Sequence, residues 1–120
     1  MLTSTQLRDL VVTALEERKA KDIVALDVAA TSPVTDYMII ASGTSNRHVN
    51  ALVDEIVTAA KARQADVIGV EGRETGEWVL VDLGDVLVHV MQVEPRAFYD
   101  LERLWTVPSP VAGSQQSLGV

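Results

Sequence analysis

The segment from residue 77 to residue 92 constrains the fold more than any other part of the chain. Two apolar runs, 77–83 and 86–92, flank the dipeptide Gly84-Asp85. A glycine at the first central position favours a two-residue hairpin turn, because that position needs a positive φ. Both runs are short and rich in valine, which is typical of strands. The sequence therefore predicts an antiparallel hairpin, and with it a sheet.

Counting outward from the turn assigns the side chains of this hairpin to two faces. One face is purely aliphatic, as a helix-covered face should be, with the pairs Leu83–Val86, Val81–Val88 and Val79–Val90. The other face pairs Asp82 with Leu87, Leu80 with His89, and Trp78 with Met91. Protein interfaces favour Trp and Met in a polar surround. This second face is therefore predicted to bind a partner, or else to be covered permanently by the last helix or a loop.

The remaining elements are predicted from the spacing of apolar residues and from the residues that cap helices or break strands. A capping box of Thr3 and Gln6 opens a first helix, and the segment Gly43-Thr44-Ser45 offers a hydroxyl cap to a second helix whose apolar stripe continues to Ala60. Strands are predicted over 22–28, 37–41 and 66–71, a loop over 72–76, and a last helix over 95–105. The fold class is α/β of the mixed α+β kind. The order α-β-β-α-β-β-β-α gives a five-stranded mixed sheet with its helices chiefly on one face. The domain is expected to span 1–107, with a disordered tail over 108–120.

Aromatic residues are scarce and unevenly placed. There are five in 120 residues, namely Tyr37, Trp78, Phe98, Tyr99 and Trp105. Rings at helical spacing usually pack into a core, but the rest of this core is built of Val, Leu, Ile and Ala. This contrast favours Tyr99 and Trp105, both on the predicted last helix, as anchors for a partner.

Charge and composition exclude several classes of protein. The formal net charge is −7, from 17 acidic and 10 basic residues, which argues against a protein that tracks nucleic-acid phosphates. The acidic segment 71–77 is expected to be a solvated loop, or a surface that steers a basic partner. The absence of cysteine excludes disulfides and thiolate sites. Neither a membrane-spanning run nor a signal peptide is recognisable, so a cytoplasmic protein is expected.

The sequence shows little sign of a catalytic site. His48 and His89 are the only histidines, and we expect the first to be solvated and the second to be structural. Asp82, Asp85 and His89 form the only plausible metal cluster, and no strand offers Asp-x-Asp. The chain is therefore predicted not to be an enzyme and to need no cofactor. The alternatives are a metal-dependent nucleotidyl or phosphoryl transferase that uses 42–46 as an anion loop, and a dimeric adaptor of another assembly.

Four segments together resemble the ribosomal silencing factor (Iojap) family: DIVALDV at 22–28, TDYMIIASGTSNRHV at 35–49, GEWVLVDLGDVLVHVM at 76–91 and FYDLERLW at 98–105. The resemblance implies a nucleotidyltransferase-like fold that has lost its catalytic carboxylates. It implies binding to the large ribosomal subunit through its protein number fourteen, at the face that the small subunit must reach. The bound factor would block joining of the subunits and lower translation when nutrients are short. Some members of the family are homodimers when free.

The resemblance also assigns the partner-binding residues. They lie on the non-aliphatic face of the hairpin and on the last helix, and the predicted set is Trp78, Leu80, Asp82, His89, Met91, Tyr99, Glu102 and Trp105. An acidic chain competes poorly for ribosomal RNA but can dock on a basic ribosomal protein. No direct nucleic-acid contact is therefore predicted, and steric occlusion alone would account for the function.

Overall fold

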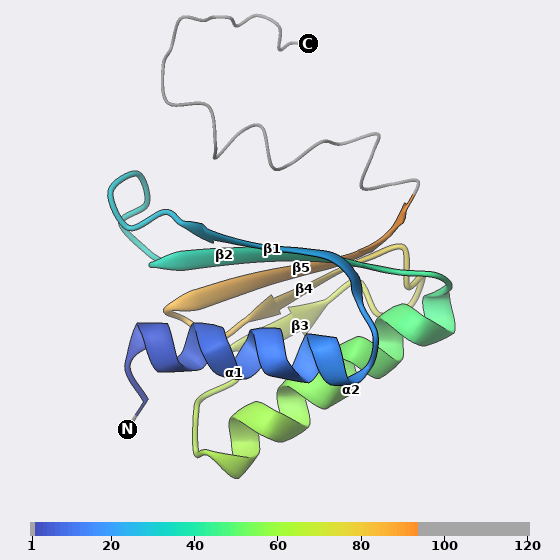
Figure 1. Ribbon diagram of the computed structural model, residues 1–120, viewed down its shortest axis with the longest axis horizontal. Coiled ribbons are helices and arrows are strands. Elements are labelled where there is room, and N and C mark those ends of the chain that lie inside the picture. Colours follow the sequence, from blue (N-terminus) through green and yellow to red (C-terminus); the bar gives the residue numbers. More distant parts are fainter. Residues whose placement is uncertain (1, 94–120) are drawn as a thin grey trace, which may run out of the picture.

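A computed structural model describes residues 2–93 and shows one sheet with both of its described helices on the same side (Figure 1). In chain order the elements are α1 (Ser4–Glu17), β1 (Lys21–Asp27), β2 (Tyr37–Gly43), α2 (Asn46–Ala62), β3 (Gly69–Glu71), β4 (Trp78–Asp82) and β5 (Val86–Gln92). The predicted last helix, the domain boundary at 107 and the predicted tail lie outside the described residues.

The sheet has five strands in the order β1-β2-β5-β4-β3. Strands β2 and β5 run parallel at its centre, and the other three pairs are antiparallel. The predicted α/β class and the mixed five-stranded sheet are thus confirmed. Because β5 lies between β2 and β4, the predicted hairpin sits in the middle of the sheet and not at its edge.

The hairpin has the predicted register. Trp78 pairs with Met91, Leu80 with His89, and Asp82 with Leu87, while Val79 and Val81 pair with Val90 and Val88. Gly84 has a φ of +84°, the conformation for which a glycine was expected at this turn. One glycine therefore fixes which side of the sheet each side chain of both strands occupies.

The core lies between the sheet and the two helices. Helix α1 contributes Leu7, Val11, Ala14 and Leu15, and α2 contributes Val49, Leu52, Val53, Ile56 and Ala60. From the hairpin come the aliphatic residues Val79, Val81, Val86, Val88 and Val90, all completely buried. Burying one such side chain contributes about 1.5–3 kcal/mol. Among residues 2–93 the fully buried side chains of this core are aliphatic, and Tyr37 packs against them from its rim. Among the described residues, no helix is long and apolar enough to cross a membrane.

Both predicted helix caps are present. The Thr3 hydroxyl accepts from the backbone N–H of Gln6, and the Gln6 side chain accepts from the backbone N–H of Thr3. The Ser45 hydroxyl accepts from the N–H of His48 at the start of α2. Each cap satisfies backbone donors that a helix leaves open at its first turn.

Two expectations were wrong in detail. The third strand is only Gly69–Glu71, shorter than the predicted 66–71, because its ladder with β4 runs only from the Gly69–Asp82 pair to the Glu71–Leu80 pair. His48 is not a solvated side chain. Its Nδ1 accepts from the N–H of Thr44 at 2.9 Å, and its Nε2 donates to the carbonyl of Arg18 at 2.8 Å. The ring thereby links the end of α1 to the start of α2, a contact between residues 30 positions apart.

Candidate partner-binding surface

The side of the hairpin that faces away from α1 and α2 is the candidate site, and we call it the hairpin face. It consists of Trp78, Leu80 and Asp82 on β4 and Leu87, His89 and Met91 on β5. The alternation of side chains along each strand places these residues opposite the buried valines. All of them except Met91 are partly exposed. The structure thus brings together every predicted hairpin residue of the partner-binding set.

Met91 is the exception, because its side chain is completely buried. It lies between Trp78 of β4 and Ser42 of β2 in the sheet, and Ser42 is also buried. Met38 and Ile40, the next residues of β2 on this side, are buried as well. The face is therefore accessible along β4 and near the turn but not along β2. Met91 is paired with Trp78 across the strands and offers no exposed area of its own to a partner.

Trp78 and His89 form a hydrogen-bonded pair at the centre of the hairpin face. They are diagonal neighbours across the two strands, and the indole Nε1–H donates to the His89 Nδ1 at 2.9 Å. The ring centroids are 5.8 Å apart and the planes are inclined by 47°, so the rings are tilted and not stacked. Burial lowers the pKa of the His89 imidazole from 6.5 to about 4. The ring is therefore neutral near pH 7, with its proton on Nε2.

This shift makes the stability of the fold depend on pH. The folded-state pKa lies below the unfolded one, so acid favours the unfolded chain. The stability contribution is complete above about pH 6.5 and is lost as the pH falls towards 4, with a total of about 3 kcal/mol at most. Urea unfolding of the wild type and of His89→Asn is compared between about pH 7 and pH 4. Because the carboxylates titrate in both proteins, the difference between the two pH dependences gives the contribution of His89 to the free energy of unfolding. Parallel stability curves for the two proteins would contradict the assignment.

Asp82 has a structural contact within the hairpin. Its Oδ1 accepts from the N–H of Gly84 at 2.9 Å, which supports the turn. Asp82, Asp85 and His89, the only metal cluster that the sequence offered, do not come together as a site. In residues 2–93, no group of three or more His, Cys, Asp or Glu side chains could hold a metal ion.

The acidic loop beside the hairpin is fastened to α2. Arg73 contacts the Asp54 carboxylate at 2.7 Å, and its carbonyl accepts from the Asn50 side chain at 3.4 Å. The carboxylates of Glu71, Glu74 and Glu77 are exposed, as expected of a solvated loop. Glu71 lies on β3 opposite Leu80. An exposed negative charge therefore flanks the apolar residues of the hairpin face.

Comparison with known proteins identifies the family. Residues 2–118 match the family model described as "Ribosomal silencing factor during starvation". The chain belongs to this family. Ribosomal silencing factors of Chromobacterium violaceum and Bacillus subtilis are 45% and 44% identical to it, over 88% and 77% of this chain and 86% and 78% of their own. The resemblance in the sequence is thereby confirmed.

A mouse relative, named "Mitochondrial assembly of ribosomal large subunit protein 1", is 38% identical over 84% of this chain and 46% of its own length. A crystal structure of a Chromobacterium violaceum protein matches with a TM-score of 0.85 at 42% identity, covering 96% of this chain and 98% of that one. A Bacillus halodurans structure matches with a TM-score of 0.77 at 39% identity, covering 84% and 94%. The names of the relatives describe regulation and assembly of ribosomes rather than catalysis.

In this member of the ribosomal silencing factor family, the segment 42–46 makes a poor phosphate cradle. An anion at a helix N-terminus needs open backbone N–H groups. The N–H of Thr44 donates to His48, the N–H of His48 donates to Ser45, and the N–H of Val49 donates to the Ser45 carbonyl. The protein itself therefore occupies the N–H groups of Thr44 and His48, which leaves fewer donors for a nucleotide phosphate at this helix start.

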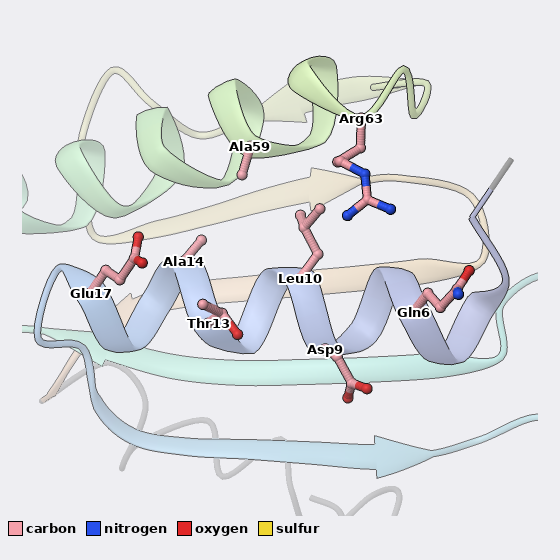
Figure 2. Close-up of a pocket in the computed structure, with 8 residues that line it drawn as sticks. All are labelled: Gln6, Asp9, Leu10, Thr13, Ala14, Glu17, Ala59 and Arg63. Carbon is pink, nitrogen blue, oxygen red and sulfur yellow. The ribbon is translucent and has the colours of Figure 1, made fainter.

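A groove of about 410 Å³ lies between the two helices, on the other side of the sheet (Figure 2). It is lined by Gln6, Asp9, Leu10, Thr13, Ala14, Glu17, Ala59 and Arg63. None of the predicted site residues lines this groove, and the sequence carried no signal for it. The predicted contacts Tyr99, Glu102 and Trp105 lie outside the described residues.

Proposed function

We propose that this chain binds the large ribosomal subunit through protein number fourteen of that subunit. The bound chain blocks joining of the small subunit and so represses translation in the cytoplasm under nutrient limitation. Family membership supports a role on the ribosome, and the hairpin face supports a protein partner. The observation that carries the proposal is a partly exposed Trp78, held on a rigid central hairpin beside Leu80 and flanked by carboxylates.

The chemistry of this face suits a basic protein better than RNA. Interfaces take most of their binding energy from a few aromatic and aliphatic anchors within a polar rim. Trp78 and Leu80 supply the anchors, while Glu71 and Asp82 supply negative charge beside them. With a net charge of −7 the chain is repelled by phosphate backbones and attracted to a basic protein surface.

Occlusion requires no turnover. A domain seated where the two subunits meet excludes the second subunit by its volume alone. The mechanism then depends only on affinity and position. The tests of the proposal are accordingly binding and exclusion, not substrate conversion.

Sedimentation of ribosomal subunits in a sucrose gradient tests both parts. Purified large subunits are preincubated with the chain before small subunits and Mg²⁺ are added. We expect the chain to co-sediment with large subunits and the peak of joined ribosomes to fall as the chain approaches saturation. If the chain stays near the top of the gradient, apart from the large subunits, binding is contradicted. Co-sedimentation with an unchanged peak of joined ribosomes would contradict the blocking mechanism and favour an assembly role, the role for which the mouse relative is named.

A further inference from the structure

We propose that His89 is a positioning residue, whose Nδ1 atom holds the Trp78 indole in the orientation that meets the partner. The inference rests on the proposed function, because it takes the hairpin face as the surface that contacts the large subunit. It assigns His89 a role through Trp78 rather than a direct contact, which is a different role from the one predicted from the sequence.

The need for such a residue follows from the place of Trp78. It is the first residue of β4, directly after the loop that follows β3. Side chains on strands commonly adopt either of two χ1 rotamers, so the backbone alone does not fix where an indole points. Met91, its direct neighbour across the strands, supplies a buried apolar contact without direction. A hydrogen bond at the indole N–H supplies the direction.

His89 is suited to this task by its position and chemistry. It sits two residues before Met91 on β5, at the diagonal position that long aromatic side chains can reach. Its cross-strand neighbours are Leu80 on one side and Ile40 on the other, which leave the ring in an apolar setting. A neutral imidazole has one lone pair, and the 2.9 Å contact directs this lone pair at the indole. The hydrogen bond between Trp78 and His89 therefore fixes the orientation of the indole ring.

A double-mutant cycle separates positioning from direct contact. The variants are His89→Phe, which fills the space without an acceptor, and His89→Asn, whose side-chain oxygen can replace Nδ1. Each is made with and without Trp78→Phe, which removes the indole donor. Binding of each variant to isolated large subunits is measured by a titration at one salt concentration. Circular dichroism and urea unfolding confirm that each variant is folded at the assay temperature.

We expect His89→Phe to weaken binding roughly three- to tenfold, the effect of one lost hydrogen bond of ordinary strength. His89→Asn should restore binding to within about twofold of the wild type. In the Trp78→Phe background, His89→Phe should have no further effect. Equal weakening by His89→Phe in both backgrounds would overturn the positioning role and make His89 a direct contact.

The free protein provides a second readout that needs no ribosome. The chain contains two tryptophans, so its nitrogen–proton NMR spectrum shows two indole signals, and Trp78→Phe identifies the one from Trp78. We expect His89→Phe to move this signal upfield and speed its exchange with water, and His89→Asn to leave it near the wild-type position. If the position and the water exchange of the Trp78 indole signal stay at their wild-type values in both variants, the inference is overturned. Wild-type chain that fails to bind large subunits would instead overturn the proposed function.

Discussion

Replacing Trp78 with alanine is expected to weaken binding to the large ribosomal subunit by about 2 kcal/mol or more, roughly thirtyfold. The substitution removes the largest partly exposed ring of the hairpin face together with the hydrogen bond that orients it. Truncating a central aromatic anchor also leaves a hollow that water must fill in the complex. The loss should appear both in a direct titration and as recovery of joined ribosomes in the gradient.

The matched control is Leu10→Ala, another truncation of a partly exposed apolar side chain. Leu10 lines the groove between α1 and α2, on the opposite side of the sheet (Figure 2). It should bind as the wild type does once both variants are compared at equal folded fractions. If Leu10→Ala lost affinity while Trp78→Ala kept it, the partner would sit on the helices and the hairpin face would be the wrong surface.

Much of the fold could be predicted because local signals and the overall topology agree. Gly84 sets the turn, the turn sets the register, and the register places each hairpin side chain on one side of the sheet. The two helix caps at Thr3 and Ser45 likewise depend only on neighbours within three residues. Such features can be predicted from a single sequence because they depend on neighbouring residues and need no distant contact.

The depth of burial could not be predicted in the same way. Alternation along a strand tells on which side a residue lies, but not what else covers that side. Met91 and Leu80 lie on the same face, yet one is completely buried and the other is partly exposed. Strand order alone does not decide this, because His89 lies on the same strand and face as Met91 and is partly exposed. Met91 lies between Trp78 and the buried Ser42, and this neighbourhood depends on contacts between distant segments.

The histidines show the same limit. His48 was expected to be solvated and His89 to be a structural residue on the partner-binding face, but each hydrogen-bonds a residue that the folded chain brings near. His48 reaches Arg18, and His89 reaches Trp78. A lone histidine in a sequence gives no sign of which nitrogen will find a partner. The hydrogen bonds that tie the helices together and orient the candidate anchor were therefore visible only in the structure.

Substituting Gly72 with alanine is the second change for which we expect a large effect. Gly72 has a φ of +95°, a conformation that costs other residues free energy, and an added Cβ would lie 2.2 Å from the carbonyl oxygen of Trp78. Strain and overlap together should destabilise the fold by roughly 2–5 kcal/mol. Relief would require the loop to move away from the start of β4, so binding by the hairpin face should also weaken.

Gly69 provides the matched control, because it lies three residues earlier, on β3. No atom lies within 4 Å of an added Cβ there, and its φ is not positive. Gly69→Ala should therefore change stability by less than about 1 kcal/mol, and urea unfolding should place its midpoint near that of the wild type. Equal midpoints for the two variants would mean that the loop around Gly72 accepts a Cβ without loss of stability. The predicted overlap between an added Cβ at Gly72 and the Trp78 carbonyl oxygen would then be wrong.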